Sequence, residues 1–354
     1  MAEQRLELGK LPMGLLEALL QRYTRPDERV VVGPRIGEDA AVLDMGTHYL
    51  VVKSDPITFA TDEIGWYVVH INANDVAAMG ATPRWFLLTL LLPGQRASRA
   101  MVEEIFRQVD GACQAMGIVL CGGHTEVTYD LERPIAVGIM LGEVEKEDLV
   151  RTGGAQAGDD LILSKGIAIE GTAVLAREVG DKLAARLGPA AVARGRRFLT
   201  EPGISVWRDA QVLCQAGRPH AMHDPTEGGL ATGLWELALA SDKALVVDLE
   251  KVPVYPETRA FCESLGLDPL GLIASGALLA ASSPAESPGM VQALAAAGIP
   301  AAVIGKVMDG PAAVHAQGPG VPGGWQPLRV FDQDELARLF AMDATASHGT
   351  GHGD

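Results

Sequence analysis

The chain has 354 residues, of which 48% are hydrophobic, and this length and composition predict two ordinary domains with real cores. Its formal net charge of −16 gives a surface that repels polyanions, so we expect neither nucleic acid nor an anionic membrane as a partner. The cysteines show no C-x-x-C spacing, the N-terminus lacks the apolar core of a signal peptide, and no apolar run could span a bilayer. We therefore expect a soluble, cytoplasmic protein with buried thiols in a reducing compartment.

In chain order, a short amphipathic helix is expected before residue 25 and a strand at residues 30–32. Gly37, Glu38 and Asp39 then lie between a glycine-rich turn and an apolar strand. Packing explains two acidic residues there poorly, whereas a Mg²⁺ or nucleotide site at the mouth of a strand would use them. A further carboxylate, Asp55, comes where the strand at 49–53 is expected to end. It fits either a binding site at a strand end or a turn before proline.

The next segment, residues 70–83, reads as a helix closed by Gly80, since glycine readily takes the left-handed conformation that ends a helix. Asn72, Asn74 and Asp75 stand in mid-helix, where such residues are neutral to unfavourable. Asp75 belongs to a half-buried face, and burying a lone carboxylate is costly, so it needs a partner. The partner is either solvent and N–H groups or a metal ion.

The apolar segment 86–92 predicts a strand buried on both faces, and residues 98–117 predict an amphipathic helix that begins at a serine cap and ends at glycine. A strand at 118–120 then leads into what reads as a turn of small residues followed by ionisable ones. This turn contains Gly122, Gly123, His124 and Thr125. His124 is either a metal or phosphate contact or a structural residue.

A charged run and a turn cluster at residues 145–158 indicate a domain boundary. We expect domains at 1–150 and 151–345 and a disordered tail at 346–354. A helix that opens near residue 169 would present free N–H groups suited to an anion. Because the sequence has no Walker A motif, a nucleotide site would not be of the P-loop class.

The second strongest site signal is the segment 223–229, which enters a helix expected to run to residue 240. It combines His223, Asp224 and Glu227 with a proline and paired glycines, so backbone and side chains could approach a ligand closely. We expect it on the acceptor side of the site, opposite the other carboxylates, with His223 able to exchange a proton near neutral pH. The alternatives are that Asp224 only caps the helix and that His223 is structural.

Taken together and in this order, the motifs resemble those of the AIR synthase (PurM-like) superfamily, and within it the HypE-like, AIR synthase-related branch. The resemblance covers about residues 30–310 and rests on five segments, Gly37–Val42, Ser54–Pro56, Asn74–Pro83, Gly122–Thr125 and His223–Leu230. It implies a two-domain α+β fold. The N-terminal α+β domain would pair its sheet with that of a second subunit to form a barrel-like dimer core, and the C-terminal domain would be an α/β sandwich.

By the same resemblance, Asp39, Asp55 and Asp75 match the family's acidic Mg²⁺–phosphate positions, and Gly122 and Gly123 match its phosphate-side turn. The implied cofactors are ATP and Mg²⁺. The residues assigned to cofactor binding are Gly37, Glu38, Asp39, Asp55, Asn74, Asp75, Gly122, Gly123, His124 and Thr125, and the residues assigned to catalysis are Asp224 and His223.

The resemblance implies an ATP-dependent enzyme that transfers a phosphoryl group to a carbonyl or amide oxygen, or to another small acceptor. The acceptor would be a small molecule or a side chain of a protein partner, and the enzyme would be a homodimer. HypE-type proteins end in a cysteine, whereas this chain ends in Gly353 and Asp354. The alternative is therefore an accessory or scaffold protein of metallocentre maturation that binds nucleotide without turnover.

Overall fold

A six-stranded sheet forms the first half of the computed structural model, which describes residues 6, 11–35, 37–58, 62–318 and 321–348. The strand order is β1-β2-β3-β6-β4-β5, and the β4–β5 pair is parallel whereas the other pairs are antiparallel. The strands are β1 (Val30–Val32), β2 (Ala41–Asp44), β3 (Tyr49–Ile57), β4 (Thr82–Pro93), β5 (Val119–Thr128) and β6 (Ile135–Val144). Three helices accompany this sheet, α1 (Met13–Tyr23), α2 (Ile64–Ala78) and α3 (Arg99–Met116).

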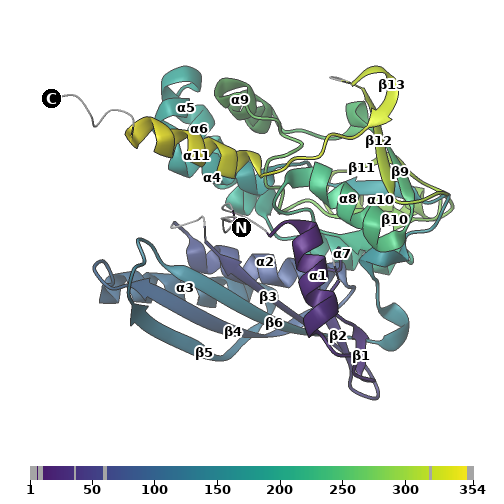
Figure 1. Cartoon of the computed structure of the whole chain (residues 1–354), viewed down its shortest axis with the longest axis horizontal. Helices are drawn as coiled ribbons and strands as arrows, with labels where there is room; N and C mark the ends of the chain where they lie inside the picture. Colours follow the sequence, from purple (N-terminus) through teal and green to yellow (C-terminus); the bar gives the residue numbers. More distant parts are fainter. Residues whose placement is uncertain (1–5, 7–10, 36, 59–61, 319–320, 349–354) are drawn as a thin grey trace, which may run out of the picture.

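Helix α2 is the central element of the molecule, because it lies between the first sheet and the second half of the chain (Figure 1). All but one of its residues are buried, and this explains why its sequence is apolar around most of its circumference. The helix ends as predicted, with Gly80 in the left-handed region at φ +74°. Its polar residues are therefore held at fixed positions inside the protein.

The second half contains a seven-stranded sheet of order β13-β12-β9-β11-β7-β10-β8. Its pairs are antiparallel except for β12 with β9. The strands are β7 (Asp160–Ser164), β8 (Ala221–His223), β9 (Ala244–Asp248), β10 (Leu279–Ser282), β11 (Ala301–Met308), β12 (Ala313–Gly318) and β13 (Val321–Pro327). Together with the first sheet, it confirms the predicted two-domain α+β fold.

Helices cover both faces of this second sheet (Figure 1). Helix α8 supplies Leu230, Leu234 and Leu237 to the core on one face, and α7 and α10 pack on the other. A further group, α4, α5, α6 and α9, shares a core with α2. The helices are α4 (Ile169–Glu178), α5 (Gly180–Leu187), α6 (Pro189–Arg197), α7 (Trp207–Ala216), α8 (Gly229–Ser241), α9 (Pro256–Leu265), α10 (Ser287–Ala296) and α11 (Glu335–His348).

Several local predictions were wrong. Strand β3 continues through Asp55 to Ile57 instead of ending before it, and α11 reaches His348, where a disordered tail was predicted. Residues 349–354 lie outside the described residues. Residues 86–92 of strand β4 alternate between buried and half-buried side chains, so in the single chain only one of the faces of this segment is fully covered. Across the described part of the chain, no helix has both the length and the apolar character needed to cross a bilayer.

Candidate active site

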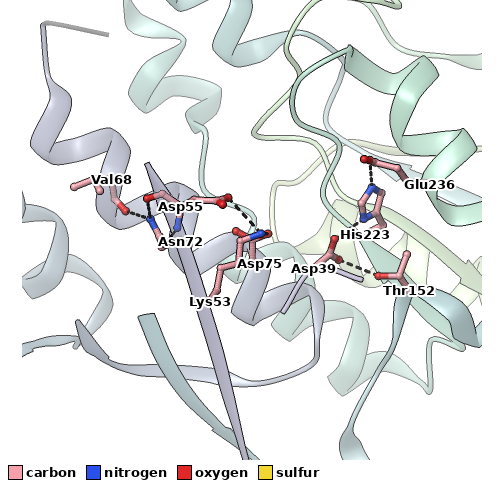
Figure 2. A network of polar contacts seen from close by, with 9 residues as sticks. All are labelled: Asp39, Lys53, Asp55, Val68, Asn72, Asp75, Thr152, His223 and Glu236. Carbon is pink, nitrogen blue, oxygen red and sulfur yellow. Dashed lines mark hydrogen bonds and ion pairs between the residues drawn. The ribbon is translucent and has the colours of Figure 1, made fainter. Parts of the chain in front are cut away.

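A cavity of about 630 Å³ lies where the two halves of the molecule meet. The first half contributes β3, α2 and the turn at residues 37–39. The second half contributes the start of α4, the segment that follows β8, and Glu236 on α8. Figure 2 shows the polar network to which several of these lining residues belong. Predicted site residues from distant parts of the chain thus meet in one place.

Three aspartates that line the cavity lie close together. One carboxylate oxygen each from Asp39, Asp75 and Asp224 lies within 4.8 Å of the others, and all three side chains are buried. Asp224 was predicted on the opposite side of the cleft, and the structure corrects this by placing it among the carboxylates. The alternative that it caps α8 is also wrong, because the cap residue is Gly228, whose N–H donates to Asp334 at 2.7 Å.

The backbone around these residues explains their positions. Asp75 is carried by the buried helix α2, and Asp224 follows β8, whose His223 pairs in register with Leu279 of β10. Gly37, two residues before Asp39, has a φ of +82°, and a Cβ there would lie 2.7 Å from the backbone oxygen of Glu236. Only glycine therefore lets this turn approach α8 so closely.

Burial dominates the electrostatics of the three aspartates. It raises the pKa of Asp75 to about 8, although the Lys53 ammonium opposes this effect with its Nζ 2.8 Å from Asp75 Oδ1. Burial also raises the pKa of Asp224 well above its usual range, with the Asp75 and Asp39 carboxylates adding to the effect. The pKa of Lys53 is raised because Asp75 and Asp55 outweigh the opposing effect of burial. Burial and the neighbouring carboxylates therefore disfavour the charged forms of Asp75 and Asp224 in the metal-free protein.

His223 has a different position from the one predicted. Its Nδ1 donates to Asp39 Oδ1 at 2.6 Å and its Nε2 donates to Glu236 Oε2 at 3.0 Å (Figure 2). Burial alone would lower its pKa, but these two carboxylates raise it well above the usual value. With both nitrogens donating, His223 holds Asp39 in place and is not available to exchange a proton with an acceptor. Thr152 supports the same carboxylate, since its Oγ1 donates to Asp39 Oδ2 at 3.1 Å.

Asp55 lines the cavity but does not belong to the aspartate cluster that was predicted to include it. Its Oδ2 lies 3.3 Å from Lys53 Nζ. Asn72, which the sequence did not single out as a site residue, accepts from the Asp55 N–H at 2.7 Å and donates to the Asp55 carbonyl at 3.2 Å. Sequence reasoning also missed Lys53. A polar residue inside a buried helix was the one available signal for Asn72, and a lysine within an apolar strand was the signal for Lys53.

Other predicted contacts lie elsewhere. Asn74 is fully buried, and it donates to the Ile204 carbonyl and accepts from the Val206 N–H, both at 2.8 Å, so it joins α2 to the start of α7. Glu38 lines the cavity but pairs with Arg151 at 2.7 Å.

Gly122, Gly123, His124 and Thr125 do not form a turn, because they lie within β5 at the edge of the first sheet and are exposed. They are not among the residues that line the cavity of this chain.

The donor set fits a hard divalent cation such as Mg²⁺. Carboxylate oxygens are the ligands that Mg²⁺ prefers, and three of them converge here. Both oxygens of Asp224 and Oδ2 of Asp75 are buried without a hydrogen-bond partner, which is costly in a metal-free protein. A cation bound between the three aspartates would satisfy these atoms. Asp39, Asp75 and Asp224 are thus the residues that could hold the metal.

Comparison with known proteins places both halves of the chain in one family. Residues 37–144 match the N-terminal domain of AIR synthase related proteins, and residues 156–316 match the C-terminal domain. A putative hydrogenase expression/formation protein of Methanocaldococcus jannaschii is 28% identical over 69% of this chain and 71% of its own length. The carbamoyl dehydratase HypE of Cupriavidus necator is 29% identical over 73% of each chain.

A selenide, water dikinase of Dechloromonas aromatica is 28% identical over 67% of this chain and 65% of its own length. Among solved structures, one of the hydrogenase maturation protein HypE is similar with a TM-score of 0.70 at 25% identity. That alignment covers 91% of this chain and 99% of the other.

Proposed function

Because this chain belongs to the AIR synthase related family, we propose that it is an ATP- and Mg²⁺-dependent enzyme that transfers a phosphoryl group to an acceptor oxygen. The acceptor oxygen is that of a carbonyl or amide, which phosphorylation turns into a leaving group. The observation that carries this proposal is the cluster of Asp39, Asp75 and Asp224, with its unpartnered oxygens at one end of a cavity large enough for a nucleotide's phosphates. A protein without such a function would gain nothing from three costly buried carboxylates.

In this proposal each residue has a defined role. Asp39, Asp75 and Asp224 hold Mg²⁺, which when bound neutralises the phosphate charge as it is redistributed during transfer. His223 fixes Asp39 through its Nδ1, and Lys53 fixes Asp75 and Asp55 through its ammonium. Asn72 fixes the backbone of Asp55. The chain thereby prepares the binding geometry before the ligands arrive, so little reorganisation accompanies the reaction.

The relatives support this class of reaction, since one is named as a dikinase and another as a carbamoyl dehydratase. No cysteine is found among the described residues that line the cavity, and Cys262 is buried in α9. We therefore infer that the acceptor is a separate small molecule or a side chain of a protein partner that enters the cavity.

The decisive experiment measures Mg²⁺-ATP binding by calorimetry and ADP and phosphate release in the presence of candidate acceptors. Asp75→Asn and Asp39→Asn should each weaken Mg²⁺-ATP binding by about 1.5 to 3 kcal/mol, the range for a hydrogen bond to a charged group. Asp309→Asn removes an exposed carboxylate and is the matched control. Unchanged affinity in both site variants would refute the metal assignment. Binding without any turnover would favour the accessory function over the enzyme.

We also propose that the protein is a homodimer formed through its first sheet. Strand β5 is an edge strand, and Val119 and Val127 on it are 56% and 60% exposed. Trp85 on the neighbouring β4 is 37% exposed. An exposed edge with apolar side chains invites pairing with another chain. A second copy would cover this face and the half-buried side of β4.

A further inference from the structure

The aspartate cluster occupies only one end of the cavity, and the other end has a different character. Glu170, in the first turn of α4, lines that end together with Ser275 and Thr226. Val174, one helical turn after Glu170, and the side chains of Ile273 and Leu336 form an apolar wall beside them. A polar group with a short apolar part attached would fit this surface.

Glu170 is a charged group at this end with an oxygen that lacks a partner. Its side chain is 7% exposed, and its Oε2 is buried without a hydrogen-bond partner. Leaving a buried carboxylate oxygen unsatisfied is costly, so its retention next to an open cavity indicates a ligand that supplies a hydrogen. This atom is the observation on which the inference stands.

The backbone here leaves no room for the anion site that the sequence predicted at the start of α4. The N–H of Glu170 donates to the Ser275 carbonyl at 3.2 Å, and the N–H of Gly171 donates to the Ile273 carbonyl at 3.1 Å. Two of the donors that would bind an anion are therefore already used.

The charges around Glu170 also disfavour an anion. Burial raises the pKa of Glu170 to about 7, the Ser275 hydroxyl opposes this, and the nearby carboxylates of Glu227 and Asp334 add to it. Asp334 is half-buried, and desolvation raises its pKa to about 6. A carboxylate or phosphate group on a ligand would be repelled at this end, whereas a nitrogen that donates hydrogen bonds would be stabilised.

We propose that Glu170 accepts a hydrogen bond from an N–H group of the acceptor, so that the acceptor is an amide with a short aliphatic group next to its amide group. This inference rests on the proposed function only in taking the aspartate end of the same cavity as the nucleotide site. It makes Glu170 a specificity-determining residue, with Val174, Ile273 and Leu336 limiting the size of the aliphatic part.

Three probes with similar branched carbon skeletons test the proposal, isobutyramide, isobutylamine and isobutyrate. Their binding to the full-length protein in saturating Mg²⁺ is followed by saturation-transfer NMR. The amide should bind, and isobutyrate should not. Glu170→Leu removes the acceptor atoms while keeping a side chain of similar length, and it should weaken N–H probe binding about tenfold or more. Glu170→Gln, which keeps the shape, should weaken amine binding to a similar extent.

Glu178→Gln is the matched control, since it removes the same charge from an exposed position on the same helix, and it should leave probe binding unchanged. The proposal is overturned if isobutyrate binds as well as the N–H probes, if isobutyramide does not bind, or if Glu170→Leu retains the affinity of the N–H probes within twofold. Calorimetry of Mg²⁺-ATP on the same variants separates the two hypotheses. If the wild-type protein does not bind Mg²⁺-ATP but Glu170 still selects N–H probes, the proposed function fails and the subsite stands.

Discussion

Replacing Asp224 by asparagine should remove most of the thermal stabilisation that Mg²⁺ gives to this protein, without damaging the metal-free fold. Both oxygens of Asp224 are buried without partners, and its carboxylate lies within 4.8 Å of those of Asp39 and Asp75. Asparagine has the same shape and removes the charge. In the metal-free protein burial and the neighbouring carboxylates already disfavour the charged form of Asp224, so its replacement by a neutral side chain should leave stability unchanged or slightly higher.

The size of the effect follows from the loss of one charged contact to the metal. A Mg²⁺ concentration a hundredfold above Kd stabilises the native state by about 2.7 kcal/mol. Loss of one charged contact costs about 1.5 to 3 kcal/mol, which raises Kd roughly 10- to 100-fold. At the same Mg²⁺ concentration the variant then keeps only about 0.4 to 1.4 kcal/mol. With roughly 2 °C per kcal/mol for a large chain, the Mg²⁺-induced rise in Tm falls from about 5 °C to about 1 to 3 °C.

The assay is differential scanning fluorimetry of chelator-treated protein with and without Mg²⁺. Asp309→Asn is the control, because that carboxylate is 89% exposed and lies on the surface, and it should respond to Mg²⁺ as the wild type does. An Asp224→Asn protein whose Tm rises as much as that of the wild type would refute the reasoning. Asp224 would then be a buried carboxyl group without a metal.

Further predictions follow from other parts of the site. Burial raises the pKa of Asp75 from 3.8 to about 8, so the folded protein holds this proton more tightly than the unfolded chain does. The resulting contribution to the free energy of unfolding is complete below about pH 4 and is lost as the pH rises towards 8. The metal-free wild type should therefore lose stability relative to Asp75→Asn over this window while its Mg²⁺ affinity rises, and a flat difference in urea unfolding would contradict this. Asn74→Ala leaves the Ile204 carbonyl and Val206 N–H unpaired and should cost about 2 to 5 kcal/mol in urea unfolding, so a loss below about 0.5 kcal/mol would exclude the tether. Gly138→Ala places a Cβ 2.4 Å from Asn72 Nδ2 and should destabilise by about 1 to 3 kcal/mol, while Gly289→Ala, which meets no neighbour, should not. Light scattering should give twice the 37.2 kDa chain mass, and a monomer at micromolar concentration would exclude the dimer.

The sequence predicted the elements whose signals are local. The helix that carries Asp75 ends at Gly80 as expected, and Ser98 accepts from the Met101 N–H at the start of α3. Asp39 and Asp75 were predicted as site residues, because an acidic residue beside a glycine turn or inside a buried helix is poorly explained by packing, and the structure places both in one aspartate cluster. These features depend on residues close together in the chain, so a single sequence contains them.

The errors have long-range causes. Asp224 joins the aspartate cluster because β8 pairs with β10 and thereby points the end of β8 towards α2, and no local pattern indicates that pairing. The paired glycines 122 and 123 suggested a turn that would bind phosphate. They instead accompany a register shift between β4 and β5, where a Cβ on Gly123 would lie 1.9 Å from the Leu88 oxygen. The structure therefore requires glycine at position 123, but the reason is close packing of two backbones and not a turn that binds phosphate.

The contacts that join the two domains also build the aspartate cluster. Asp39 and Asp75 come from the first domain, whereas Asp224 comes from the second, and the second-domain His223 binds Asp39 at 2.6 Å. Next to Asp75, Asn74 ties α2 to the backbone that precedes α7. If the domains separated, the cluster would lose Asp224, and Asp39 would lose its contact with His223. A metal that needs all three aspartates therefore binds the docked arrangement in preference to any other, and its binding free energy adds to that of domain docking. Metal binding should consequently make the two domains unfold as one unit, because neither can leave without releasing the ion.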